Sequence, residues 1–215
     1  MADSEPTTST PAINAVVFDM GGVLVRLGPL EDVLAGVTTA RAGSSSGDDL
    51  WTRWILADAV RSYERGRCST EEFAAALIAE LDLALEPTEL IERFQRFPMG
   101  LYNGAADLAA EVRATCTIGV LSNTNELHWT EQTDHEIVQG LFDRDYLSYV
   151  LDMVKPDADI YDHVIADLGL PASEILFIDD NQINVDGALA RGMQAALAKG
   201  PGEARSALTR LGVLS

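Results

Sequence analysis

Short apolar runs alternate with segments of helical periodicity along most of the chain. The runs at residues 13–18, 117–121, 147–151, 175–178 and 193–198 are each predicted to form a strand. They carry few polar side chains, as is typical of strands that helices cover on both faces of a parallel sheet. The alternation therefore predicts an α/β fold built on a doubly wound parallel sheet.

Helical spacing of the apolar positions is clear in four segments, at residues 105–114, 126–139, 157–168 and 181–191. In the third segment, Ile160, Val164 and Leu168 fall on one face of the predicted helix. Pro156 suits the first turn of that helix, where no amide proton is needed, and Gly169 suits its end.

Residues 29–98 interrupt this alternation. Their apolar positions predict helices at 50–63, 70–81 and 88–97 but no strand. Ser69 followed by Glu72 is a capping-box pattern, which predicts the start of the second of these helices. Gly28-Pro29 and the stretch 98–100 break regular structure and are candidate hinges. We expect a core domain of residues 13–28 and 99–215, with a small helical cap domain of residues 29–98 inserted after the first strand.

Composition narrows the classes of partner. With 34 acidic and 15 basic side chains, the 215 residues have a formal net charge of -19, which disfavours nucleic acid and anionic membranes as partners. Residues 1–12 lack the basic and apolar regions of a signal peptide and are predicted to form a disordered tail. No apolar run approaches the about 18 residues needed to cross a bilayer, so we expect a cytoplasmic protein.

Polar side chains follow four of the predicted strands. In chain order they are Asp19, Ser122 with Asn123, Lys155, and Asp179 with Asp180. Doubly wound sheets bind ligands outside the carboxyl ends of their strands, so we expect these side chains to meet at one edge. The adjacent carboxylates of Asp179 and Asp180 repel each other unless a cation or hydrogen-bond donors neutralise them. The set therefore indicates a nucleophile, a hydroxyl donor, a fixed cation and a metal site.

The strings around these residues resemble the four motifs of the haloacid dehalogenase-like (HAD) hydrolase superfamily, in the branch with a helical cap. They are most similar to sugar phosphatases of the α-D-glucose-1-phosphate phosphatase type in Phe18-Asp-Met-Gly-Gly-Val, Leu121-Ser-Asn-Thr-Asn, Lys155-Pro-Asp-Ala-Asp and Phe177-Ile-Asp-Asp-Asn. The resemblance implies a HAD-type Rossmann-like core and a Mg²⁺-dependent phosphoric monoester hydrolase. Its substrate would be a small phosphorylated metabolite, such as a hexose 1-phosphate, hydrolysed through an aspartyl-phosphate.

The resemblance also implies roles for individual residues. The catalytic residues would be Asp19 as nucleophile, Ser122 and Lys155. The Mg²⁺ ligands would be Asp19, the backbone carbonyl of Gly21, Asp179 and Asp180, while Asn184 takes the place of a later acid. Ser122, Asn123 and Lys155 are expected to bind the substrate. The cap loop at residues 63–67 is a further candidate for sugar contact, and we expect Arg65 to supply that contact.

Gly21 is a departure from the pattern of most phosphatases in the superfamily. They carry an Asp there, which protonates the leaving oxygen and is typically worth ~10²–10⁴ in rate. An anomeric phosphate has a more acidic leaving hydroxyl, so we expect hexose 1-phosphates to be better substrates than alkyl phosphates. His128 is a candidate substitute proton carrier. Trp51 and Trp54 are expected to pack inside the cap rather than to form a sugar platform.

Other functions stay open on the sequence alone. A 2-haloacid dehalogenase uses the same carboxylate to displace halide, but it would not need the acidic pair for Mg²⁺. A non-catalytic phosphate- or partner-binding HAD-like protein would keep the site without turnover, and the missing acid favours it. A phospho-acceptor signalling domain fits poorly, because such domains place the acidic pair before the acceptor.

Overall fold

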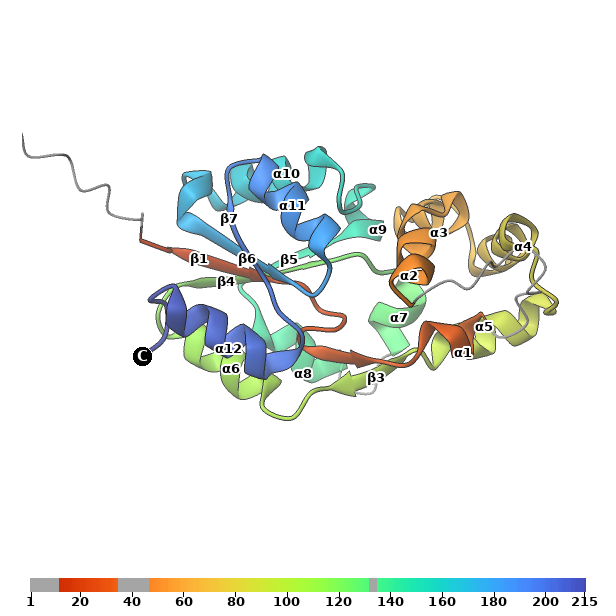
Figure 1. Cartoon of the computed structure of the whole chain (residues 1–215), viewed down its shortest axis with the longest axis horizontal. Coiled ribbons are helices and arrows are strands. Elements are labelled where there is room, and N and C mark those ends of the chain that lie inside the picture. The colour runs from red at the N-terminus through yellow and green to blue at the C-terminus, as the bar shows by residue number, and fades with distance from the viewer. Residues whose placement is uncertain (1–11, 35–46, 132–134) are drawn as a thin grey trace, which may run out of the picture.

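The computed structural model describes residues 12–34, 47–131 and 135–215. Residues 1–11 of the predicted tail lie outside this part of the chain. Figure 1 shows a sheet with helices on both faces, whose strands run toward a group of helices at one end of the molecule. No helix in the described ranges combines the length and the apolar character that crossing a bilayer requires.

Five parallel strands form the main sheet, in the order β5-β4-β1-β6-β7. Their bounds are β1 Ala15–Phe18, β4 Thr117–Ser122, β5 Arg144–Leu147, β6 Ile175–Asp179 and β7 Gln194–Leu197. The central strand β1 is fully buried, and its last residue, Phe18, lies level with Val120 of β4 and Ile178 of β6. The chain therefore leaves β1 at Asp19, between the carboxyl ends of its two neighbours.

Helices cover both faces of this sheet (Figure 1). One face packs against α6 (Ala105–Arg113), α8 (His135–Leu141) and α12 (Gly200–Arg210), and the other against α10 (Ala158–Leu168) and α11 (Gln182–Ala190). Val16 and Phe18 belong to the first apolar cluster, whereas Ala15 and Val17 belong to the second. This alternation explains why β1 has no polar side chain, since both of its faces are covered. The predicted α/β fold with a doubly wound parallel sheet is confirmed.

A helical insertion leaves the core after β2 (Val25–Leu27) and returns at β3 (Pro98–Leu101). It contains α1 (Leu30–Val33), α2 (Gly47–Leu56), α3 (Asp58–Glu64), α4 (Thr70–Leu81) and α5 (Pro87–Gln95). These helices have an apolar cluster of their own, in which Tyr63 stacks on Phe73 at 4.4 Å between ring centroids. As predicted, α4 begins with a capping box between Ser69 and Glu72.

The antiparallel pair β2–β3 was not predicted, because its strands are short and one contains both Pro98 and Gly100. The two connections to the insertion are therefore hydrogen-bonded to each other. The Gly28 amide also donates to the Phe97 carbonyl, at 2.8 Å.

Some predicted boundaries were wrong. The apolar run 147–151 is mostly helix α9 (Ser148–Leu151), and the strand lies just before it, in β5. β5 is an edge strand that begins with exposed Arg144 and Asp145, so its apolar signal is weak. Pro156 is not in the first turn of α10: it lies in a turn closed by the Asp157 amide and the Val154 carbonyl, and Asp157 is the N-cap.

Two predicted helices are interrupted. Extended backbone at Ala57 divides the segment 50–63 between α2 and α3. The segment 126–139 contains α7 (Glu126–Glu131) and the start of α8, while residues 132–134 lie outside the described part of the chain. The predicted end of α10 is confirmed, since Gly169 is its left-handed C-cap.

Candidate active site

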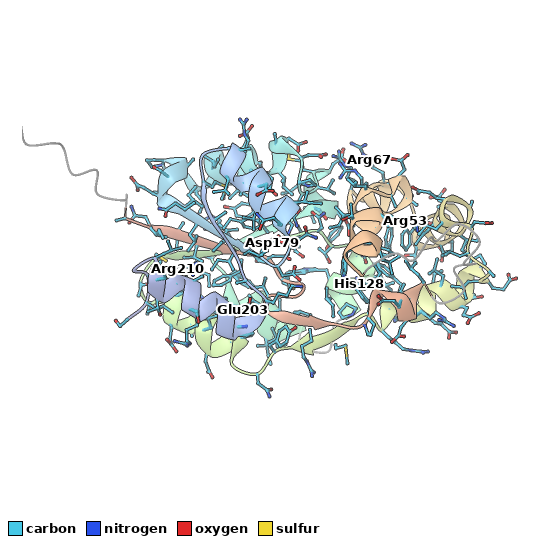
Figure 2. The ribbon with its side chains drawn as sticks, viewed as in Figure 1. Arg53, Arg67, His128, Asp179, Glu203 and Arg210 are labelled. Atoms are coloured by element: carbon cyan, nitrogen blue, oxygen red, sulfur yellow. The ribbon has the colours of Figure 1, made fainter. Side chains whose placement is uncertain are left out.

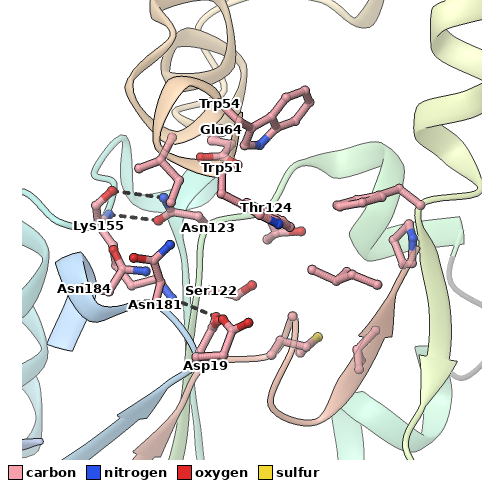
Figure 3. Close-up of a pocket in the computed structure, with 18 of the residues that line it drawn as sticks. Asp19, Trp51, Trp54, Glu64, Ser122, Asn123, Thr124, Lys155, Asn181 and Asn184 are labelled. Carbon is pink, nitrogen blue, oxygen red and sulfur yellow. Dashed lines mark hydrogen bonds and ion pairs between the residues drawn. The ribbon is translucent and has the colours of Figure 1, made fainter. Parts of the chain in front are cut away.

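The side chains predicted to act together do meet at the carboxyl edge of the sheet. Asp19 follows β1, Ser122 ends β4 and Asp179 ends β6, and the loop after α9 brings Lys155 to the same edge. Figure 2 shows Asp179 at the end of the sheet that faces the helical insertion. Above these residues is a cavity of about 500 Å³ (Figure 3). Asp19, Ser122 and Lys155 line it, together with Asp180.

Lys155 is the buried cation of the site. Its side chain is 1% exposed, and its Nζ lies 2.7 Å from Asp19 Oδ1 and 2.7 Å from Asp179 Oδ2. Burial alone would lower the pKa of Lys155, but these two carboxylates more than offset this and raise it. Lys155 is therefore charged at neutral pH and is fixed next to the nucleophile candidate.

Asn123 holds the backbone of Lys155 in place. Its Oδ1 accepts from the Lys155 amide at 2.8 Å, and its Nδ2 donates to the Lys155 carbonyl at 3.1 Å, as the dashed lines in Figure 3 show. The end of β4 thereby fixes the loop that carries the cation. Asn123, which directly follows Ser122, also lines the cavity.

Three carboxylates gather beside this cation. Ligand oxygens of Asp19, Asp179 and Asp180 all lie within 4.8 Å of one another. Burial raises the pKa of Asp19 to about 8, with repulsion from Asp179 and Asp180 adding to the effect and Lys155 opposing it. Burial likewise raises the pKa of Asp180 to about 6, and repulsion from Asp179 contributes. One lysine does not balance three carboxylates, so a divalent cation would stabilise the ionised cluster.

The surroundings of the cluster fit Mg²⁺. Carboxylates, a backbone carbonyl and water are the oxygen ligands that Mg²⁺ prefers, and Gly21 lines the cavity next to Asp19. Asn184 Nδ2 donates to both oxygens of Asp179 at 3.1 Å, whereas Asn184 Oδ1 is buried without a hydrogen-bond partner among the described residues. A buried acceptor of this kind needs a donor, and water bound to a cation supplies one.

Gly22 permits the approach of Asp180. A Cβ at this position would lie 2.2 Å from Asp180 Oδ2, and its φ of +73° is in the left-handed region. The second glycine of the Asp19-Met-Gly-Gly string thus has a steric reason, because any side chain would displace the carboxylate. From the sequence, a role was predicted only for Gly21.

Arg65, the expected sugar contact, lies outside the cavity lining. Its guanidinium instead forms an ion pair with Asp157, to which Arg61 also donates at 2.6 Å. Arg67 pairs with Asp152 at 2.6 Å. These arginines join the end of α3 to the loops of the core, and the pairing with Asp157 holds the Arg65 guanidinium outside the cavity lining.

Glu64 is the residue of the 63–67 loop that does line the cavity. Its role was not predicted from the sequence, although the loop itself was a candidate for substrate contact. Burial raises the pKa of Glu64 to about 7, while Lys155, Arg61 and a side-chain hydrogen bond from Asn123 act in the opposite direction. In Figure 3, Glu64 and Asp19 lie on opposite sides of the cavity.

Aromatic side chains form much of the wall that the insertion contributes. Trp51, Trp54, Phe94 and Phe97 line the cavity and also belong to the apolar cluster of the insertion. Trp54 packs against Phe94 with 5.6 Å between ring centroids. The two tryptophans therefore pack within the insertion, as expected, and at the same time face the cavity.

His128 also lines the cavity, but its ring is committed elsewhere. Nε2 lies 2.8 Å from the Phe94 carbonyl, which can only accept, so Nε2 carries the proton. Burial lowers the pKa of His128 to about 4. The imidazole is neutral and its proton is held by the backbone, which argues against the proposed role as substitute proton carrier.

Two known phosphatases are similar to this chain in sequence. D-ribitol-5-phosphate phosphatase of Bacteroides thetaiotaomicron is 27% identical over 185 residues, covering 80% of this chain and 85% of that protein. Sesquiterpene phosphatase astK of Aspergillus oryzae is 28% identical over 185 residues, covering 83% of this chain and 86% of that protein.

Solved structures share the fold. The HAD family enzyme bt-2542 from Bacteroides thetaiotaomicron has a TM-score of 0.70 and 25% identity, covering 93% of this chain and 100% of that chain. A second structure of bt-2542, in complex with magnesium and inorganic phosphate, has a TM-score of 0.67 at 24% identity, covering 87% of this chain and 95% of that chain. The family of haloacid dehalogenase-like hydrolases matches residues 13–192. The predicted superfamily is thus confirmed, and the chain belongs to the haloacid dehalogenase-like hydrolases.

Proposed function

We propose that the protein is a Mg²⁺-dependent phosphatase that hydrolyses a small phosphorylated metabolite through an aspartyl-phosphate on Asp19. The substrate class that we favour is a sugar phosphate, such as a hexose 1-phosphate. One observation carries the proposal: Asp19 lies at the floor of a cavity, next to the buried Lys155 and within a carboxylate cluster that fits Mg²⁺.

In this mechanism, an Asp19 carboxylate oxygen attacks phosphorus and the bond to the leaving oxygen breaks. Water then attacks phosphorus, releases inorganic phosphate and returns the Asp19 carboxylate, so one displacement is divided into two easier steps. Lys155 and the Ser122 hydroxyl hold phosphoryl oxygens, and Asn123 fixes Lys155 for this task. Mg²⁺, held by Asp19, the Gly21 carbonyl, Asp179 and Asp180, would offset the negative charge of the phosphoryl group.

We further propose that residues 29–98 act as a cap on a core of residues 13–28 and 99–215. The helical insertion supplies the wall opposite Asp19, so it excludes water from the reaction and contacts the leaving group. Ion pairs from Arg61 and Arg65 to Asp157 support the closed position.

An apolar organic monophosphate is a second candidate substrate. Trp51, Trp54 and Phe97 give the cap side of the cavity an aromatic surface that suits an apolar chain as well as a sugar ring. A sesquiterpene phosphatase is among the similar proteins, as is a D-ribitol-5-phosphate phosphatase, so a terpenoid and a sugar-alcohol phosphate each have a precedent there.

A phosphate-release assay tests the proposal. Purified protein is incubated with hexose 1-phosphates, hexose 6-phosphates, pentitol phosphates and isoprenoid monophosphates, each with Mg²⁺ and with EDTA. We expect release that requires the metal, and the ranking of the esters decides between the two substrate classes. Tight vanadate binding without turnover would instead indicate a binding protein, and halide release from 2-haloacids would indicate a dehalogenase.

Asp19→Asn tests the nucleophile. The amide cannot form an acyl-phosphate, so we expect phosphate release to fall by at least about 10³-fold, within the range for loss of a principal catalytic group. Asp186→Asn, an exposed change on α11, is the matched control and should retain activity. Circular dichroism and urea unfolding check that both variants are folded. Substantial turnover by Asp19→Asn would mean that another group attacks phosphorus.

A further inference from the structure

We propose that Glu64 is the general acid and base of this site, protonating the leaving oxygen and then accepting the proton of the attacking water. The inference rests on the proposed phosphatase function and adds a residue from the helical insertion to its mechanism. It accounts for hydrolysis without an acid at Gly21.

Elimination among the ionisable side chains that line the cavity leads to Glu64. In the described part of the chain they are Asp19, Glu64, His128, Lys155, Asp180 and Lys199. Asp19 is the nucleophile, and Asp180 belongs to the cluster that fits the cation. His128 already donates a hydrogen bond from Nε2 to the Phe94 carbonyl.

The two lysines already interact with carboxylates of the cluster. Lys155 is held between Asp19 and Asp179, and its raised pKa makes it a poor proton donor. Lys199 acts on Asp180, whose pKa its charge lowers. Glu64 is thus the ionisable lining residue that has neither a phosphate-binding nor a metal-binding task.

The position of Glu64 suits proton transfer. An in-line displacement places the leaving oxygen opposite the attacking oxygen of Asp19. That direction points toward the helical insertion, because Asp19 projects from the core and Glu64 ends α3 on the far side of the cavity (Figure 3). The attacking water of the second step must approach from the same side, since the phosphoryl group is then bound to Asp19.

The surroundings of Glu64 let it act in both steps. The charged groups that act on it are Lys155 from the core and Arg61 from its own helix, and both favour the carboxylate. Asn123 donates to it and also holds Lys155, so one side chain connects the proton carrier with the cation. Burial outweighs these effects and brings the pKa to about 7, where a carboxyl can both give and take a proton near neutral pH.

The proton balance closes over one turnover. As the bond between phosphorus and the leaving oxygen breaks, the Glu64 carboxyl transfers its proton to that oxygen and the alcohol departs. As water attacks the aspartyl-phosphate, the Glu64 carboxylate takes one water proton while the bond between Asp19 and phosphorus breaks. Inorganic phosphate leaves, and both residues return to their starting states.

Glu64→Gln tests the inference, because glutamine keeps the size of the side chain and an oxygen that can accept from Asn123. For alkyl phosphates we expect kcat/KM to fall by about 10²–10⁴-fold, the usual effect of losing a general acid. For 4-nitrophenyl phosphate the leaving group needs no proton, so the first step should stay fast while the water step slows. We expect Glu64→Gln to give a burst of one nitrophenolate per active site, and we expect no such burst from the wild-type protein.

The pH dependence of kcat/KM distinguishes a proton carrier from a structural residue, because loss of a structural residue would leave this dependence unchanged. The alkaline decline of wild-type kcat/KM with alkyl phosphates, expected near pH 7, should disappear in Glu64→Gln. Glu64→Asp, which keeps an ionisable group, should recover part of the activity and of the decline. Asp58→Asn removes an exposed carboxylate from the same helix and should match wild type.

Two results would overturn the inference. An equal fall in kcat/KM for alkyl and aryl phosphates in Glu64→Gln, with no burst and an unchanged pH profile, would assign Glu64 to substrate binding and leave the proposed function intact. Failure of the wild-type protein to release phosphate from any ester would overturn both proposals together.

Discussion

Gly22 determines how closely the Asp180 carboxylate can approach the other two carboxylates of the site. Because a Cβ there would lie 2.2 Å from Asp180 Oδ2, the absence of a side chain lets Asp180 join Asp19 and Asp179. The same residue has a φ of +73°, which non-glycine residues adopt only with strain.

Gly22→Ala should therefore weaken the binding of Mg²⁺ by at least about 10-fold, in addition to a strain of about 1–3 kcal/mol. Gly104→Ala is the matched control, since Gly104 has a φ of +82° but no atom within 4 Å of the added Cβ. The control should lose stability without losing Mg²⁺ affinity, as measured by calorimetric titration and urea unfolding. Equal Mg²⁺ affinity in the two variants would show that Asp180 can move aside.

At the scale of residues, the sequence allowed Asp19, Ser122, Lys155 and the acidic pair to be predicted because three of these sites end a strand or directly follow one, at the same edge of the sheet. No comparable rule predicts that Glu64 faces the cavity. It belongs to a helix end, where neighbours point about 100° apart and packing decides which of them faces the cavity. An arginine is the more obvious ligand for a phosphorylated substrate, yet the nearby Asp157 attracts Arg65 away from the cavity.

The end of α3 is the element that connects the insertion to the core by charge. Arg61 and Arg65 both reach Asp157, whose side chain is 36% exposed, so the contact is only partly shielded from solvent and salt. Asp157 is the N-cap of α10 but makes no side-chain capping bond. Its charge therefore serves the contact with α3 rather than the helix that it begins.

Asp157→Asn should loosen the contact between the insertion and the core. Exposed or partly exposed ion pairs contribute about 0.2–1 kcal/mol each, so the loss of two should raise KM by about 2–30-fold with little change in kcat. Asp162→Asn breaks the pair with Arg191, which lies within the core, and should leave KM unchanged. Steady-state kinetics at low and high salt provide the measurement, and the difference between the variants should shrink at high salt. A fall in kcat at constant KM would contradict this account.

Burial also explains which elements could be predicted. β1, β4 and β6 are interior strands with apolar side chains on both faces, and their runs were identified within two residues. β5 is at the edge and starts with charged residues, so the apolar pattern marked the adjacent α9 instead. β2 and β3 are too short for a periodic signal, and they pair only because the insertion brings its two ends together.

Over the whole molecule, the buried carboxylate cluster should make stability depend on pH and on the proposed metal. The folded state raises the pKa of Asp19 from 3.8 to about 8 and that of Asp180 from 3.8 to about 6. Without metal, the folded state thus binds more protons than the unfolded chain across this range. These groups contribute stability that is fully present below about pH 4 and is lost as the pH rises through about 6 and 8.

Mg²⁺ should reverse this trend, because it binds the ionised carboxylates. We expect the increase in melting temperature caused by Mg²⁺ to be larger at pH 8 than at pH 5.5. At about 100 times its Kd, Mg²⁺ should raise the free energy of unfolding by about 2.7 kcal/mol. Thermal unfolding with Mg²⁺ and with EDTA measures the effect. Asp19→Asn lacks one of the titrating groups and should show a shallower pH dependence in EDTA. A Mg²⁺ effect of the same size at both pH values would argue against the carboxylate cluster as the binding site.

The pairing of β2 with β3 has a consequence for how this protein can diversify. The chain enters and leaves the insertion through the two-stranded ribbon β2–β3, which is separate from the five-stranded sheet. The insertion also has an apolar cluster of its own. Evolution can therefore lengthen, shorten or exchange the segment beyond the ribbon without shifting any strand that carries Asp19, Ser122 or Asp179. A graft of the corresponding segment from a relative onto this ribbon should transfer that relative's choice of ester while the chemistry at phosphorus is inherited unchanged.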